Sequence, residues 1–177
     1  MSNRYFYLLP FLCLFACIQI SANIDHLDID PRFKISIFAQ DLDSPRQMAE
    51  DLDGRVYVGS KKAGKIFALN DSDKNGQVDE KILIAEGLTF ATGVSFFKGD
   101  LFFSEINKIW KIENIADYFK TNLDQLPKKV LVTDNLPSEE WHGWKWIKHD
   151  VDGNLYTNVG APCNVCVRGD KRFATIL

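Results

Sequence analysis

The sequence lacks the charge patterns that are typical of nucleic-acid-binding proteins. It has no basic stripe and no long acidic run, and 21 basic against 24 acidic residues give a formal net charge of −3. These features argue against a nucleic-acid partner. After the first twenty residues, no apolar run is long enough to cross a bilayer. With 46% hydrophobic and 25% charged residues, the 177-residue chain has the composition of one globular domain with a core.

The amino terminus resembles an export signal. Arg4 precedes an almost unbroken apolar run, Tyr5–Ile20, which ends shortly before the small residue Ala22. This order predicts a secretory signal peptide over residues 1–22, cleaved after Ala22. Two alternatives stay open, an uncleaved membrane anchor and lipid attachment at Cys17, which follows a weak lipobox. We expect an exported protein, periplasmic or extracellular, that meets a membrane only if Cys17 carries a lipid.

The remaining residues, 23–177, have the pattern of successive antiparallel strands. Short apolar and aromatic runs alternate with clusters of Gly, Asp, Asn and Lys. A helix is expected only in a short polar-flanked window, Asn114–Asn122. One five-residue pattern (a turn residue, Gly, a polar, an aliphatic and an aromatic residue) recurs at Asp53–Tyr57, Lys98–Phe102 and Asp152–Tyr156.

The spacing of these turns predicts the fold class. Gly54, Gly99 and Gly153 are 45 and then 54 residues apart, close to the period of a four-stranded propeller blade. We therefore predict an all-β fold, a β-propeller, with an ordinary meander as the alternative. The chain has room for about three blades, whereas closed propellers use roughly four to eight. We expect residues 23–177 to be the amino-terminal part of a longer propeller domain, because an open stack leaves unpaired edges.

His142 is the candidate catalytic residue. It lies beside Gly143 just before an expected strand, where a loop can present an imidazole to a central cavity. Histidine is the side chain best suited to accept a proton near neutral pH. The alternative is a structural histidine, satisfied by local hydrogen bonds within an aromatic core. His149, in the following turn, and His26 resemble ordinary surface histidines.

Three tryptophans lie within six residues around this histidine, at positions 141, 144 and 146. In an extended segment, successive side chains point to opposite faces. Trp144 and Trp146 are therefore expected on one face, and Lys145 and Ile147 on the other.

The segment Asp71–Asp79 resembles the first nine positions of an EF-hand loop, with oxygen-bearing side chains at the ligand positions and Gly76 at the sixth. However, Ile82 stands where a bidentate Glu is required, and no helices flank the loop. A polar hairpin turn is the favoured interpretation, and a calcium site is the alternative.

Cys163 and Cys166 form a CxxC motif with four possible interpretations. A structural zinc site would need a second CxxC, and c-type haem attachment would need His where Val167 stands. A thioredoxin-like redox pair belongs at a helix start in an α/β fold. A short disulfide is favoured by the oxidising compartment expected for an exported chain.

Over roughly residues 35–177, the sequence resembles the sorbosone dehydrogenase branch of the soluble sugar dehydrogenases that depend on pyrroloquinoline quinone (PQQ). The most specific match is the segment with the two cysteines, and the Asp-Gly hairpins are generic to propellers. The segments that carry the resemblance are Ser44–Ala49, Ala85–Leu88, Thr92–Val94, Trp141–Lys145 and Gly160–Cys166.

The resemblance implies a six-bladed propeller when complete, with PQQ over the central channel, supported by Ca²⁺. It implies that His142 contacts the cofactor and acts as the general base on a small sugar or aldehyde. This base removes a proton from a sugar hydroxyl or an aldehyde hydrate while hydride passes to the quinone. The substrate and the electron acceptor are not specified by these residues.

The chain also departs from the family's pattern. The arginines, the lysine and the calcium ligands that hold the cofactor lie mostly in later blades, so no metal ligand is assigned here. Ser60–Lys62 offer no clear match to the polar residue of the first blade that contacts the quinone. The 177 residues alone are therefore expected to be inactive. The alternative function is a non-catalytic propeller that binds a carbohydrate or peptide as a binding or scaffold module.

Overall fold

The computed structural model describes residues 24, 26–121, 123–166 and 169–177. The chain divides into two compact units, residues 1–35 and 36–177. The predicted signal peptide and Cys17 lie outside the described residues. In the described part of the first unit the chain forms turns, one of them stabilised by an ion pair between Arg32 and Asp30 at 2.8 Å. No helix among the described residues is long and apolar enough to span a bilayer.

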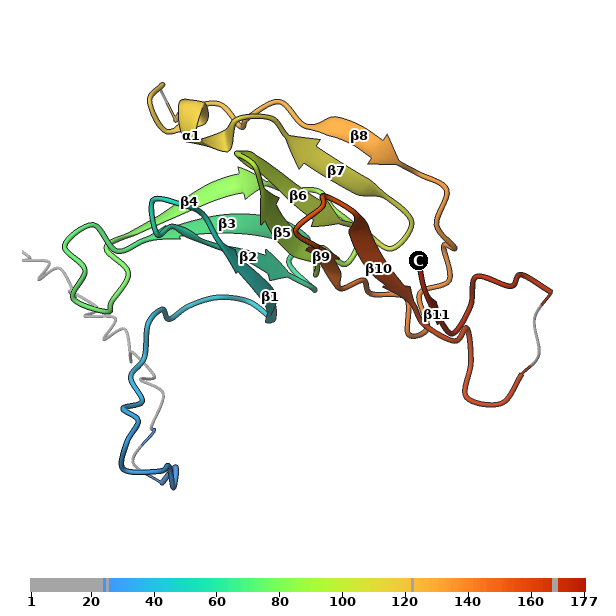
Figure 1. Ribbon diagram of the computed structural model, residues 1–177, viewed down its shortest axis with the longest axis horizontal. Helices are drawn as coiled ribbons and strands as arrows, with labels where there is room; N and C mark the ends of the chain where they lie inside the picture. The colour runs from blue at the N-terminus through green and yellow to red at the C-terminus, as the bar shows by residue number, and fades with distance from the viewer. Residues whose placement is uncertain (1–23, 25, 122, 167–168) are drawn as a thin grey trace, which may run out of the picture. The chain divides into compact units, whose positions relative to one another are not determined.

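The second unit consists of three antiparallel sheets, each a meander in chain order (Figure 1). This arrangement confirms the predicted all-β class and forms part of a β-propeller, with one sheet for each expected blade. The first sheet contains β1 (Pro45–Glu50), β2 (Val56–Ser60), β3 (Lys65–Asn70) and β4 (Glu80–Ala85). The second contains β5 (Val94–Phe97), β6 (Asp100–Ser104), β7 (Ile109–Ile112) and β8 (Val130–Thr133). The third contains β9 (Ile147–His149), β10 (Leu155–Val159) and β11 (Thr175–Ile176).

The recurring turns connect the first two strands of each sheet, as predicted. Gly54, Gly99 and Gly153 have φ of +89°, +95° and +97°, a backbone conformation that glycine adopts without steric cost. The short helix α1 (Ile115–Tyr118) lies between β7 and β8, inside the window predicted from the sequence.

In the first sheet an aspartate stabilises the turn. The Asp51 carboxylate accepts hydrogen bonds from the backbone N–H groups of Asp53 and Arg55 and from the Tyr57 hydroxyl. Burial, followed by the nearby Asp51 charge, raises the pKa of Tyr57, so this hydroxyl remains a donor.

The third sheet repeats the arrangement with Asp150. Its carboxylate accepts hydrogen bonds from the backbone of Asp152 and Asn154 and from the Tyr156 hydroxyl. The hydrogen bonds from Asn154 are the main cause that lowers the pKa of Asp150 to about 2. Side chain and backbone therefore specify the same hairpin in the first and third sheets.

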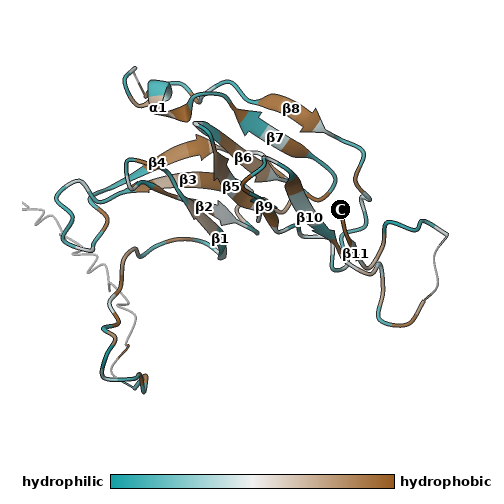
Figure 2. Cartoon of the chain, in the orientation of Figure 1, coloured by the Kyte–Doolittle hydropathy of each residue, from teal (hydrophilic) through white to brown (hydrophobic). Residues whose placement is uncertain are grey.

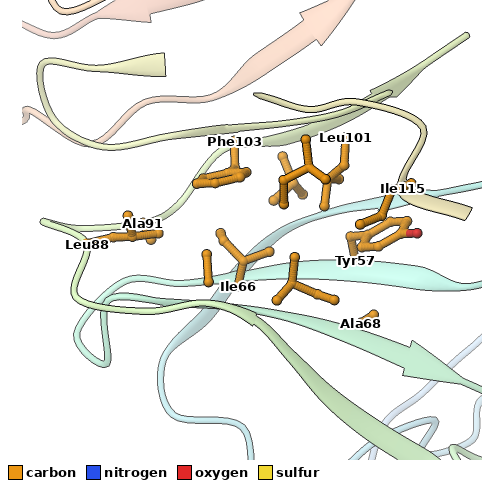
Figure 3. Close-up of a cluster of buried hydrophobic side chains, with 12 residues drawn as sticks. Tyr57, Ile66, Ala68, Leu88, Ala91, Leu101, Phe103 and Ile115 are labelled. Carbon is orange, nitrogen blue, oxygen red and sulfur yellow. The ribbon is translucent and has the colours of Figure 1, made fainter. Parts of the chain in front are cut away.

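The three sheets pack through their first strands, β1 against β5 and β5 against β9. Figure 2 shows that the hydrophobic residues concentrate in the strands, whereas the connecting loops are mostly hydrophilic. Between the first two sheets, side chains from both meet in one cluster (Figure 3). A fully buried aliphatic or aromatic side chain stabilises the fold by about 1.5–3 kcal/mol. The cluster includes Tyr57, Ile66, Ile84, Leu101, Phe103 and Ile115.

Candidate functional site

His142 lies in the turn that leads into β9. Its backbone is in the left-handed region, with φ of +53°, which is strained for a residue other than glycine. The half-buried ring places Nδ1 2.9 Å from the backbone carbonyl oxygen of Ala161. Because a carbonyl oxygen only accepts hydrogen bonds, Nδ1 is the protonated nitrogen of the neutral ring. Nε2 therefore holds the free lone pair that a general base needs.

His142 is closely packed by two aromatic rings and by the backbone at Gly160. Its ring lies 5.4 Å from the ring of Trp141 and 6.5 Å from that of Trp144, nearly perpendicular to the latter. Gly160 packs directly against the His142 backbone, and a Cβ atom at this position would collide with the His142 carbonyl oxygen. Glycine is therefore required here for a close approach of two chain segments.

The residues after His142 alternate between two faces, as the sequence predicts. The side chains of Trp144 and Trp146 are 42% and 49% exposed, whereas Lys145 and Ile147 are buried. This alternation precedes the regular strand, since β9 begins only at Ile147.

Besides the pairing of β9 with β10, side chains from β1, from β10 and from the residue pair before β5 hold this extended segment. The Gln47 amide of β1 donates to the Ile147 carbonyl oxygen at 2.6 Å and accepts from the Ile147 N–H at 3.0 Å. The Thr92 hydroxyl donates to the Lys145 carbonyl oxygen at 2.7 Å. The Asn158 amide of β10 accepts from the Trp146 N–H at 2.5 Å. The strand that follows His142 is therefore fixed to each of its neighbours.

Lys145 is a buried amine within this segment. Its side chain is 2% exposed, and Nζ donates a hydrogen bond to the Gly143 carbonyl oxygen at 2.5 Å. Burial lowers the pKa of Lys145 to about 8, and the charge of Glu139 opposes the shift. Lys145 forms no ion pair with any described residue.

A pocket of about 490 Å³ opens beside this segment. No acidic residue lines it, and Arg46 brings a cation to its wall. A second cation lies next to it, because Lys61 Nζ is 3.5 Å from the ring centroid of Trp144. His142 does not line the pocket, but its ring neighbours that of Trp144, which does. The lining residues are Pro45, Arg46, Gln47, Thr92, Trp144, Lys145, Trp146 and Asn158.

Cys163 and Cys166 form a disulfide, with their Cα atoms 5.9 Å apart. This result confirms the interpretation favoured by the sequence. The disulfide lies on the connection between β10 and β11, two residues after the carbonyl group that His142 contacts. Val165, inside the bridged loop, is 95% exposed.

The segment Asp71–Asp79 connects the antiparallel strands β3 and β4, as the favoured hairpin interpretation predicts. Ligand atoms of Asp71, Asp73 and Asp79 lie within 4.8 Å of one another. These carboxylates also accept hydrogen bonds within the loop, for example from the Gly76 N–H to Asp71 and from the Ser72 hydroxyl to Asp79. Calcium at this loop remains an alternative prediction.

The sequence-based prediction for His149 was wrong. Instead of lying at the surface, its ring is half-buried between two aromatic rings. It is stacked on the Phe97 ring and tilted against the Phe102 ring, with distances between ring centroids of 4.8 Å and 4.4 Å. Nδ1 is 3.0 Å from the Ser95 hydroxyl oxygen, and burial lowers the pKa of His149. Both aromatic partners belong to the second sheet, so the local sequence around His149 did not reveal them. His26 is exposed, as expected.

Sequence reasoning missed most of the residues that hold the site. Gln47 and Ile147 are 100 residues apart, and neither carries a motif that would pair them. Lys61 was left without a role, although it contacts Trp144. For Lys145 a signal was available, because the alternation of faces placed it opposite Trp144 and Trp146, on the side that is buried.

Comparisons with known proteins agree with this fold. The family model described as a domain of unknown function (DUF7133) matches residues 19–174. The chain belongs to this family. An uncharacterized protein of Borreliella burgdorferi is 28% identical over 184 residues, which cover 99% of this chain and 46% of that protein. The chain therefore spans about half the length of this relative.

Three solved structures resemble the chain in fold. A calcium structure of a Trichoderma reesei enzyme of Carbohydrate-Active Enzymes Family AA12 has a TM-score of 0.56 and 17% identity, over 72% of this chain and 32% of that one. The holo PQQ domain of Coprinopsis cinerea pyranose dehydrogenase has a TM-score of 0.54 and 16% identity, covering 70% and 29%. The PQQ-bound aldose sugar dehydrogenase of Streptomyces coelicolor has a TM-score of 0.52 and 18% identity, covering 70% and 40%. At these identities, the resemblance concerns the fold alone.

Proposed function

We propose that this chain is the amino-terminal part of an exported PQQ-dependent sugar or aldehyde dehydrogenase, of the sorbosone or aldose type, with His142 as its general base. The observation that carries the proposal is the hydrogen bond between His142 Nδ1 and Ala161, which leaves Nε2 free as an acceptor. The fold supports the proposal, since two of the similar solved structures are described as PQQ forms of sugar dehydrogenases.

The chemistry of the pocket fits the cofactor. PQQ is a planar quinone that carries carboxylate groups, and the pocket offers aromatic walls and cations without a competing acid. Trp144 and Trp146 would pack against the ring system, and Arg46 and Lys61 would pair with carboxylates. When bound, the quinone supplies the hydride acceptor, which no protein side chain can provide. We propose Ca²⁺ as its supporting ion and assign no ligand of that ion to this chain.

His142 would handle the proton in this reaction. Nε2 would accept the proton of a substrate hydroxyl group, either of a sugar or of an aldehyde hydrate, as hydride leaves the carbon that bears this hydroxyl group. The imidazolium that results keeps its Nδ1–H bonded to the Ala161 carbonyl oxygen, which stabilises the positive charge. The cofactor residues expected in later blades complete the site, so the 177 residues alone should lack activity.

The test uses the longer protein of which we propose this chain to be a part. It is assayed with PQQ, Ca²⁺, an artificial electron acceptor and a panel of aldoses, sorbosone and simple aldehydes. His142→Ala should lower kcat by about 10²–10⁴-fold, the usual contribution of a general base. His26→Ala, at an exposed position of the first unit, is the matched control and should retain full activity.

Two outcomes would overturn the proposal in different ways. Full activity in His142→Ala would exclude His142 as the base while keeping the dehydrogenase. A longer protein that does not bind PQQ in a titration would instead favour the alternative, a binding or scaffold propeller. Binding by such a module would be tested by titrating the folded protein with oligosaccharides and peptides.

Export is tested separately. Cell fractionation should place the protein outside the cytoplasm, and amino-terminal sequencing of the mature form should begin at Asn23. Incorporation of labelled fatty acid that Cys17→Ser abolishes would indicate the lipid-anchored alternative.

A further inference from the structure

The hydrogen bond that sets the state of His142 comes from the main chain. Ala161 contributes its backbone carbonyl oxygen to Nδ1 and not a side chain. The position of this oxygen depends on the backbone from Gly160 onward, in the connection that leaves β10. Whatever fixes that backbone also fixes which ring nitrogen of His142 is protonated.

On its near side, this backbone is fixed by packing. Gly160 follows β10 directly and lies against the His142 backbone, with no space for a side chain between them. The connection ends at β11, which pairs with β10, Asn158 with Ile176 and Val159 with Thr175. Leu177, directly after β11, adds two backbone hydrogen bonds to Thr157 of β10.

The returning part of the connection carries its own hydrogen bonds. Arg172 binds the Asp170 carboxylate and the backbone of Asn135, and the Thr175 hydroxyl binds the Arg172 carbonyl oxygen. The outgoing part, residues 160–166, is different. Among the described residues, its only hydrogen bond is the one between Ala161 and His142. In the part of the chain that the structure describes, its one other link is the disulfide between Cys163 and Cys166.

We propose that the Cys163–Cys166 disulfide is a positioning element for His142. The bridge closes residues 163–166 into a small ring and restricts their backbone, which begins two residues after Ala161. The Ala161 carbonyl oxygen thereby stays on Nδ1, and Nε2 stays the nitrogen with the free lone pair. The two cysteines are thus positioning residues that act through a carbonyl group of the main chain.

Opening the bridge should release this control. The outgoing part would gain conformational freedom, and the Ala161 carbonyl oxygen would no longer be held against the ring. Neutral His142 would then distribute its proton between both nitrogens, so a smaller fraction of the protein would present a free Nε2. The relevance of this fraction to catalysis rests on the proposed function, but the tautomer itself does not.

The experiment measures the tautomer directly, on the full chain without cofactor or substrate. Long-range ¹H–¹⁵N correlation spectra of histidine-labelled protein distinguish Nδ1–H from Nε2–H in a neutral ring. The oxidised protein should show His142 in the Nδ1–H form. An added dithiol then passes two electrons and two protons to the sulfur atoms, which breaks the S–S bond, gives two thiols and leaves the dithiol as its own disulfide. After reduction, Nδ1–H should no longer be the dominant form.

Internal and matched controls separate positioning from unfolding. The signal of His149 should not change, because its ring contacts Ser95, Phe97 and Phe102 of the second sheet. Cys163→Ser together with Cys166→Ser should reproduce the effect of reduction. Val165→Ser alters the same loop at a residue that is 95% exposed and keeps the bridge, so it should retain the Nδ1–H form.

One result would overturn the inference. If thiol titration shows complete reduction and His142 keeps the Nδ1–H form, the disulfide does not position this residue. Should the double serine variant fail to fold, reduction of the folded native chain is the deciding measurement. Because the readout requires no activity, a failure of the proposed function would leave this result unaffected, and the reverse also holds.

Discussion

The side-chain amide of Gln47 binds both backbone groups of Ile147, a residue 100 positions further along the chain. One amide therefore stands in for a neighbouring strand, and it links the first strand of the first sheet to the first strand of the third. These two hydrogen bonds hold Ile147, at the end of the extended segment that follows His142, against β1. The residue before Gln47 in β1 is Arg46, which lines the pocket.

Gln47→Ala should destabilise the protein by at least about 3 kcal/mol. The substitution removes three hydrogen bonds, two to Ile147 and one from the Val94 N–H. The N–H and C=O groups of buried Ile147 and the N–H of Val94 lose these partners, at about 1–3 kcal/mol for each unsatisfied group. Urea unfolding followed by fluorescence gives the free energy. Met48→Ala changes the neighbouring residue, which is 63% exposed, and should cost much less. Equal losses in the two variants would contradict this role of Gln47.

Gly160→Ala should disturb His142 more than any small change elsewhere in the same connection. The new Cβ atom would collide with the His142 carbonyl oxygen, so one backbone must move, at a cost of about 1–3 kcal/mol. Gly169→Ala is the matched control, since nothing lies within 4 Å of a Cβ atom there. Unfolding free energies and the NMR signals of the His142 ring are measured in both. Unchanged His142 signals in Gly160→Ala would show that the contact has no positional role.

Lys145→Met should remove a pH dependence of stability in the alkaline range. Burial lowers the pKa of Lys145 to about 8 in the folded protein, from its ordinary value of 10.5. Between these values the unfolded chain binds a proton that the folded chain does not, so the free energy of unfolding of the native protein rises with pH. Below about pH 8 the cost of the buried charge is fully present.

The measurement compares native protein and variant at pH values from about 8 to 10.5. The difference in their free energies of unfolding should shift steadily in favour of the native protein as pH rises. Lys148→Met, at an exposed position of β9 three residues further along the chain, should leave the pH dependence as it is in the native protein. A native protein with flat stability over this range would show that the Lys145 amine is not desolvated.

Features set by local sequence could be predicted. The turns at Gly54, Gly99 and Gly153 depend on a backbone conformation that glycine adopts and on residues within a few positions, so their recurrence indicated sheets of propeller type. The exposed and buried faces of the segment after His142 followed from the alternation of an extended chain.

Features set by contacts between sheets could not be predicted. His149 resembled a surface residue because its partners, Phe97 and Phe102, belong to another sheet. The Gln47 bonds and the acceptor for His142 Nδ1 likewise join distant segments. The sequence could nominate His142, whereas its protonated nitrogen became apparent only once Ala161 was placed beside it.

The position of Lys61 has an optical consequence. Its ammonium group lies 3.5 Å from the ring centroid of Trp144 and 5.4 Å from that of Phe90. An indole excited state responds to a nearby charge, so the emission of Trp144 depends on where this ammonium group lies. Any anion that draws Lys61 away from the ring would change that emission. The protein thus contains an intrinsic fluorophore at its own pocket, with which ligand entry can be followed without a label.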